Sequence, residues 1–214
     1  MGYSVAMLSK ILQVVEGLPS IVGVRIGTEE PFFVEEATVG PVQIRRYGPR
    51  IAAQTAVDGD GQDARSEGFR RLAGYIFGGN HRSTEIAMTA PVAQQSQSIA
   101  MTAPVAQSRT ADGASVIRFF MPSKYSLDTL PEPDDGLVTL VEVPGETMAV
   151  LRFSGDRSER AVATKTAELL DLLRDSSFAP AGDPVAWFYD PPWTLPPLRR
   201  NEVAVPVAAA APQP

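Results

Sequence analysis

Arginines and apolar side chains alternate in one short stretch of the chain, which makes it the first place to look for chemistry. The stretch contains Arg65, Phe69, Arg70, Arg71, Leu72 and Tyr75. A flat apolar ligand that carries carboxylates, such as a porphyrin, needs an apolar wall for its ring and guanidinium groups for its acids. The alternative is that the arginines are solvated and the apolar residues belong to the core. Residue types alone favour that alternative.

Few side chains could bind a metal ion. His81 is the only histidine and, by its chemistry, the best iron ligand; Tyr75 and the methionines Met88, Met101 and Met121 are poorer ones. Met88 and Met101 lie in strand-like segments, where methionine usually packs in the core. A single histidine after two glycines is more often a surface residue than a ligand. We therefore expect no specific coordination and keep His81 as the metal candidate and Met88 as a ligand contact.

Composition narrows the functional classes. The net charge is −6 and the isoelectric point is near 4.9, which argues against general nucleic-acid binding. The chain has no cysteine, so thiol catalysis and thiolate metal sites are excluded, and a reducing cytoplasmic location is compatible with this composition. No nucleophile-elbow, phosphate-loop or dinucleotide-binding motif is present. We expect a binding protein rather than an enzyme.

The elements that would position these residues follow one order twice. Each half has two strands around a Pro/Gly turn, then a helix, then further strands. The expected segments are strands at 42–44 and 51–57 before a helix at 64–77, then strands at 137–143 and 148–153 before a helix at 158–174, and strands at 185–189 and 202–207. Val42 and Val138 have the same separation as Ile44 and Leu140, since 138 − 42 = 140 − 44 = 96. This pattern predicts an α+β fold from a duplicated ββαββ unit.

A shorter repeat is identical in its two copies. Residues 86–94 and 99–107 both have the sequence IAMTAPVAQ, at a spacing of 99 − 86 = 13. Each copy resembles a strand that ends at its proline. Two arrangements are open: the copies pair as a hairpin, or one copy loops out.

The ends of the chain carry separate expectations. Residues 1–28 have apolar positions at helical spacing, which predicts an amphipathic helix that packs on the body of the protein. Membrane contact through residues 5–18 is the less favoured alternative, because that segment has one cation. Residues 29–207 form the expected domain, and the Ala/Pro tail 208–214 is expected to be disordered.

Several motifs, in order and in spacing, make the chain similar to the SOUL haem-binding family. They are IRRY at 44–47 with Arg50, YIFGGN at 75–80, IAMTAPV at 86–92, FMPSKY at 120–125, FSG at 153–155, YDPPW at 189–193 and NEV at 201–203. The tandem repeat resembles bacterial members rather than animal ones.

The resemblance implies a fold and a ligand. The fold would be a distorted antiparallel β-barrel with two flanking helices, one from each half. The ligand would be haem or another porphyrin, bound non-covalently and reversibly in an apolar cleft near the first helix. A histidine is a proposed iron ligand in some animal members, but no motif places that position at His81. Two alternatives stay open: a small-molecule effector-binding module of the same fold, and an enzyme that degrades or dechelates haem, for which the sequence offers no activating group.

Overall fold

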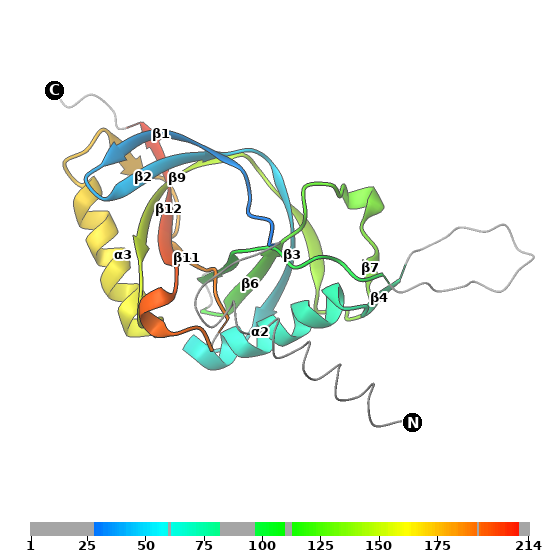
Figure 1. Ribbon diagram of the computed structural model, residues 1–214. Helices are drawn as coiled ribbons and strands as arrows, with labels where there is room; N and C mark the ends of the chain where they lie inside the picture. Colours follow the sequence, from blue (N-terminus) through cyan, green and yellow to red (C-terminus); the bar gives the residue numbers. More distant parts are fainter. Residues whose placement is uncertain (1–27, 60, 82–96, 110–112, 192, 210–214) are drawn as a thin grey trace, which may run out of the picture.

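The computed structural model describes residues 28–59, 61–81, 97–109, 113–191 and 193–209 (Figure 1). The helix expected in residues 1–28, apart from Thr28, lies outside this range, as do the first copy of the repeat and Met88. The described strands are β1 (Phe33–Val39), β2 (Val42–Tyr47), β3 (Arg50–Val57), β4 (Asn80–His81), β5 (Val105–Arg109), β6 (Ser115–Phe120), β7 (Glu132–Pro133), β8 (Thr139–Val143), β9 (Glu146–Phe153), β10 (Phe178–Pro180), β11 (Val185–Phe188) and β12 (Asn201–Ala209). The helices are α2 (Gly61–Ile76) and α3 (Glu159–Leu173), with short 3-10 turns at Leu127–Thr129 and Pro196–Leu198.

One large antiparallel sheet carries both helices, so the α+β expectation is confirmed. Its strand order is β1-β2-β9-β12-β11-β5-β6-β3-β8, and β10 pairs with β12. β4 and β7 form a separate two-stranded sheet. Among the described residues no pairing joins β1 to β8, so the ladder of hydrogen bonds is open at these two strands. Figure 1 shows α3 beside β9 and β12, and α2 across β3 and β6.

Helix α2 lies unusually close to the sheet. Leu72 and Ile76 are buried on its inner face. Gly68, one turn nearer the start of the helix, faces Ile117 of β6. A Cβ atom at position 68 would lie 2.4 Å from Cγ1 of Ile117, so only glycine allows this approach. The helix ends as expected from its glycines: Gly78 has φ +115° and the Gly79 N–H donates to the Gly74 carbonyl at 2.8 Å.

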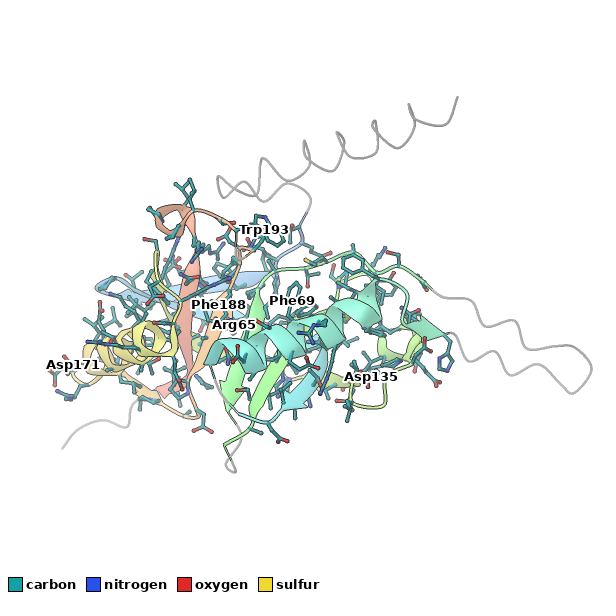
Figure 2. All side chains as sticks on the ribbon, turned by 90° about the horizontal axis from the view of Figure 1, so that it is seen from below. Arg65, Phe69, Asp135, Asp171, Phe188 and Trp193 are labelled. Carbon is teal, nitrogen blue, oxygen red and sulfur yellow. The ribbon has the colours of Figure 1, made fainter. Side chains whose placement is uncertain are left out.

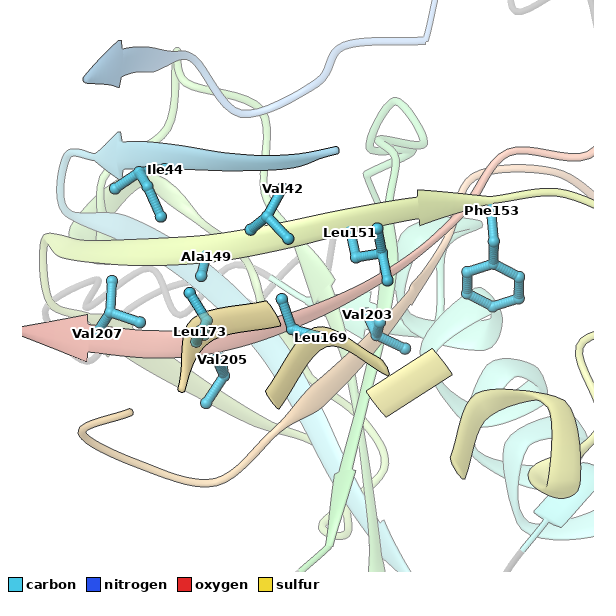
Figure 3. Close-up of a cluster of buried hydrophobic side chains, with 10 residues drawn as sticks. All are labelled: Val42, Ile44, Ala149, Leu151, Phe153, Leu169, Leu173, Val203, Val205 and Val207. Atoms are coloured by element: carbon cyan, nitrogen blue, oxygen red, sulfur yellow. The ribbon is translucent and has the colours of Figure 1, made fainter. Parts of the chain in front are cut away.

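Helix α3 covers a second part of the core. Ser158 precedes it and its hydroxyl accepts a hydrogen bond from the Ala161 N–H, as an N-cap should. Leu169 and Leu173 are buried against β2, β9 and β12 (Figure 3). The expected helix at 158–174 is confirmed to within one residue at each end.

Three sequence-based interpretations change. β12 includes Ala208 and Ala209, which pair with Ala179 and Phe178, so the expectation of disorder is wrong for these two residues. Residues 132–135, an acidic and Pro-containing stretch whose composition predicts a solvated loop, contain β7, which pairs with β4. Both edges of residues 105–107 are occupied, by β6 and by β11, so a hairpin between the two repeat copies is excluded for this strand. No helix in the described part of the chain is long and apolar enough to cross a bilayer.

Candidate functional site

Helix α2 separates the side chains that the sequence grouped together. Leu72 and Tyr75 are 0% and 2% exposed, and the Tyr75 hydroxyl donates to the Pro131 carbonyl at 2.9 Å. Burial raises the pKa of the Tyr75 phenol. These two residues hold the helix on the sheet, which corrects the expectation that they contact a ligand: at helical spacing they fall on the inner face.

Arg70 and Arg71 lie on the flank of α2 that contains Glu67. Arg70 forms an ion pair with Glu67, and the Arg71 Nε lies 3.1 Å from the same carboxylate. Arg71 also donates to the Ala56 carbonyl at 3.3 Å. Neither arginine is joined to Arg65 by any of these contacts, so the structure does not bring the three together as one site.

Arg65 and Phe69 lie on the opposite flank, which faces β11. The Arg65 guanidinium stacks over the Phe188 ring, 4.6 Å from its centroid. It also donates to the Gln107 side chain at 3.3 Å and to the Arg157 carbonyl at 3.4 Å. Phe69 packs edge-on against Phe119, with ring centroids 5.2 Å apart, and remains 37% exposed. Figure 2 labels Arg65, Phe69 and Phe188 in this region of the molecule.

Two further arginines extend this flank with positive charge. Arg157 Nη1 donates to the Asp190 carbonyl at 3.1 Å, and Arg199 Nε donates to the Thr194 carbonyl at 2.8 Å. Burial and the charge of Arg157 lower the pKa of Arg65 to about 10. Burial and the charge of Arg199 likewise lower the pKa of Arg157.

Carboxylates compensate only part of this positive charge. Asp156 favours the charged form of Arg65, and Asp190 favours that of Arg157, so each raises its neighbour's pKa. Both arginines nevertheless have a lowered pKa, because burial and the neighbouring guanidinium outweigh the acids. Arg157 therefore repels Arg65, and Arg199 repels Arg157, and an anion bound beside them would relieve that repulsion.

Exposed apolar side chains border the arginines on the segment between β11 and β12. Trp193, Leu195 and Leu198 are 62%, 50% and 46% exposed. We refer to Arg65, Phe69, Arg157, Trp193 and Arg199 as the α2–loop surface. The sequence singled out Arg65 and Phe69 as candidates but not the other three residues. The YDPPW motif pointed to the Trp193 segment, whereas nothing in the local sequence marks Arg157.

Buried polar contacts hold the segment between β11 and β12 in place. The Tyr189 hydroxyl donates to the Glu202 carboxylate at 2.6 Å, and the Arg200 N–H donates to the Asp190 carboxylate at 2.6 Å. Burial, followed by the charge of Glu202, raises the pKa of Tyr189. Glu202 also binds Arg45, 3.0 Å away on β2. The position of Trp193 and Arg199 thus depends on the core of the sheet.

His81 lies beyond the other end of α2. Its Nδ1 is 2.5 Å from the Asp134 carboxylate, and its Nε2 is 3.7 Å from that of Glu132. Arg65 and Ile76 are eleven positions apart on the helix, about 16 Å along its axis, and His81 follows five residues after Ile76. In the described residues no group of three or more histidines and carboxylates could hold a metal ion.

A separate cavity of about 530 Å³ opens near the start of β3 and the end of β6. Its lining includes Glu29, Arg50, Phe120, Tyr125 and Glu142. The Arg50 guanidinium lies between the rings of Tyr47 and Phe120, at 4.5 and 4.7 Å. This volume falls in the range of small-molecule pockets, roughly 300–1,000 Å³.

Comparison with known proteins places these features in a family. Residues 28–206 match the family model described as SOUL heme-binding protein. The chain is 28% identical to heme-binding protein 2 of Mus musculus over 137 residues, which is 64% of this chain and 63% of that protein's length. It is 29% identical to heme-binding protein 1 of Xenopus laevis over 160 residues, 74% of this chain and 80% of the relative.

Solved structures with little sequence identity share the fold. The EcmrR C-terminal domain superposes with a TM-score of 0.58 at 9% identity, covering 79% of this chain and 98% of that one. A hydrolase from Listeria innocua gives a TM-score of 0.54 at 10% identity, covering 78% and 91%. At these identities the likeness concerns the fold alone.

Proposed function

Because the chain belongs to the SOUL heme-binding protein family, we propose that it binds haem or another porphyrin at the α2–loop surface. The observation that carries the proposal is the row of arginines, in which Arg157 repels Arg65 and Arg199 repels Arg157, beside exposed aromatic side chains. A porphyrin matches both kinds of side chain on this surface. Its propionates are anions for the arginines, and its ring is a flat apolar face for the aromatic groups.

The residues fit such a ligand by type and position. Phe69 and Trp193 offer apolar faces, and Arg65, Arg157 and Arg199 offer guanidinium groups for the propionates. His81 lies in β4, beyond the end of α2 opposite to Arg65, and pairs with Asp134, so it does not belong to the same surface. We therefore propose that ring burial and propionate pairing supply the affinity, that binding is non-covalent and reversible, and that iron coordination contributes little.

The proposed role is binding, as in haem handling or buffering, and not catalysis. Among the side chains of the α2–loop surface, arginine and aromatic groups offer no general base near neutral pH and no nucleophile. We also propose a cytoplasmic location, which the absence of cysteine supports.

Titration with hemin and with metal-free protoporphyrin tests the proposal. We expect a Soret change that saturates at one equivalent, with micromolar affinity or weaker, on the order of −8 kcal/mol. Protoporphyrin should bind within about tenfold of hemin. Abolition of binding when iron is removed would show that coordination, not the α2–loop surface, carries the affinity.

The cavity of about 530 Å³ supports a second candidate, a small-molecule effector-binding module. Its aromatic and carboxylate lining suits an organic ligand other than a porphyrin dianion. Ser123→Trp would fill this cavity from its exposed rim and leave the α2–loop surface intact. If Ser123→Trp abolished the binding of a cationic fluorescent dye such as rhodamine 6G and left hemin unaffected, the two sites would be separate.

The detail of the fold is also a proposal: a duplicated ββαββ unit whose sheet curves into a distorted barrel. The support is the matching of positions 96 residues apart. β3 begins at Arg50 and β9 at Glu146, and 146 − 50 = 96. The shift places β2 on β8 and β3 on β9, so the pairing of β2 with β9 corresponds to the pairing of β8 with β3. A two-fold relation between the halves requires this correspondence.

A further inference from the structure

The tandem repeat offers two identical segments for a single place in the fold. The second copy, residues 99–107, occupies that place, which we call the β5 site. Ile99, Ala103 and Ala106 are 1%, 4% and 4% exposed there. The residues thirteen positions earlier, Ile86, Ala90 and Ala93, have the same side chains. The β5 site therefore cannot distinguish the copies by their apolar packing.

The polar contacts of the β5 site do not distinguish them either. The Thr102 hydroxyl donates to the Phe120 carbonyl, and the Ala103 N–H donates to the Glu29 carbonyl at 3.0 Å. Gln107 accepts a hydrogen bond from Arg65. The first copy has the same three residue types in the same order, because the nine letters are identical.

The chain enters the β5 site at Gln97, whose backbone is bound by Asn80 and whose side chain donates to the Tyr125 hydroxyl at 3.1 Å. The Asn80 side chain donates to the Gln97 carbonyl at 2.7 Å and accepts from the Gln97 N–H at 2.9 Å. Thr84 is the residue thirteen positions before Gln97 and carries the same backbone groups. Between Asn80 and Thr84 stand His81, Arg82 and Ser83, and three residues are a common length for a tight hairpin connection.

We propose that the two copies compete for the β5 site, so that the chain has two registers thirteen residues apart. In the second register residues 86–94 replace residues 99–107. The surplus segment then moves from the connection after Asn80, at the end of α2, to the connection before Ser115. Ser115 donates to the Gly59 carbonyl, so this second position lies at the start of α2.

The cost of exchange is confined to the connections. One loop shortens and the other lengthens by the same number of residues, and the entropy of closing a loop depends only weakly on its length. A turn directly after Asn80 would break the pairing of His81 with Glu132 and its contact with Asp134. These contacts, together with the Gln97–Tyr125 hydrogen bond, for which Thr84 has no amide group, favour the register in which the second copy is bound.

Aspartate substitutions in each copy test the exchange. Ala106 is buried among aromatic and aliphatic side chains, so a carboxylate there is strongly unfavourable. If the first copy can replace the second, Ala106→Asp alone should lower the Tm by only a few degrees. Ala93→Asp alone should change it little. The double variant should lower the Tm by roughly 10 °C or more, or fail to fold.

A single-copy chain provides the control. Deletion of residues 86–98 leaves one copy with the short connection after Asn80, and we expect it to fold. Ala106→Asp in that background should be as damaging as the double variant is in the full chain. If Ala106→Asp in the full chain is already as unstable as the double variant, the proposal is overturned.

Cross-linking gives an independent measurement in the native chain, which has no cysteine. Ala106 lies opposite Arg118 in the β5–β6 ladder. Ala106→Cys with Arg118→Cys should form a disulfide, and so should Ala93→Cys with Arg118→Cys in a folded chain. Ser96→Cys with Arg118→Cys is the control, because Ser96 would lie opposite Arg118 in neither register. A disulfide yield for the Ala93 pair no higher than for this control would contradict the exchange.

Discussion

Arg45 and Glu202 form an ion pair in the interior of the sheet, with Nη1 and Oε2 3.0 Å apart and side chains 4% and 0% exposed. The two residues are 157 positions apart in the sequence. Glu202 also accepts hydrogen bonds from Tyr189 and Arg200, so one carboxylate joins β2, the end of β11 and β12. Removing it would leave the buried Arg45 guanidinium without its acid, whereas Arg200 would still pair with Glu30.

We therefore expect Glu202→Gln to destabilise the protein strongly. Loss of one member of a buried pair costs about 3–5 kcal/mol, because the other charge is left uncompensated. Glu36→Gln is the matched control: Glu36 pairs with Arg46, and these side chains are 36% and 59% exposed. That change should cost less than about 1 kcal/mol. Denaturant unfolding of the wild type and the two variants measures both losses of stability. Equal losses would contradict the role given to the buried pair.

The same carboxylate predicts a dependence of stability on pH. Burial raises the pKa of Glu202, but the hydrogen bond and charge of Arg45 outweigh it, so the pKa lies below its ordinary value of 4.5. A pKa that is lower in the folded state gives stability that is present above the unfolded pKa and is lost as the pH falls through the folded one. The stability difference between the wild type and Glu202→Gln should shrink as the pH is lowered from about 5. A difference that stays constant from neutral pH to pH 3 would contradict the lowered pKa.

Porphyrin binding should distinguish the two flanks of α2. Arg65→Gln removes a guanidinium from the α2–loop surface and should weaken hemin and protoporphyrin alike, by about 1 kcal/mol or roughly fivefold. Arg70→Gln, on the flank that holds Glu67, should leave both affinities unchanged. Absorbance titration measures the four dissociation constants, for two variants with two porphyrins each. Unfolding of each variant checks that it is folded. Equal weakening by both variants would move the site elsewhere on the helix.

His81→Ala tests the iron ligand. Because His81 lies beyond the far end of α2 and contacts Asp134, the substitution should change neither hemin affinity nor the Soret and visible bands. A change from a low-spin to a high-spin spectrum, with hemin weakened much more than protoporphyrin, would instead identify His81 as an axial ligand.

A pair of glycines in α2 tests how the helix meets the sheet. Gly68→Ala forces a Cβ atom against Ile117 and should destabilise the protein by about 1–3 kcal/mol, through overpacking. Gly74 is exposed and a Cβ there meets nothing within 4 Å, so Gly74→Ala should stabilise by about 0.5–1 kcal/mol. Thermal unfolding compares the two, and a stable Gly68→Ala protein would show that α2 can move away from β6.

The sequence alone determined the elements and the family. Strand–turn–strand patterns and helical spacing are local properties, so the two strands on either side of Pro144–Gly145, the start of α3 at Ser158 and the end of α2 at Gly78 were all predictable within a residue or two. The motif order was equally readable and agreed with the family match over residues 28–206. Helical spacing also fixed the angles between Arg65, Arg70 and Arg71 around their helix.

Only the tertiary structure decided which of these arginines faces the rest of the site. The sheet buries Leu72 and Tyr75, and this sets the rotation of α2 that turns Arg65 toward β11 and Arg70 away from it. Arg157 reaches Arg65 from 92 positions further along the chain. No local pattern encodes that approach. It follows from the pairing of β5 with β11, which joins the two halves and is stabilised by burial summed over the whole core.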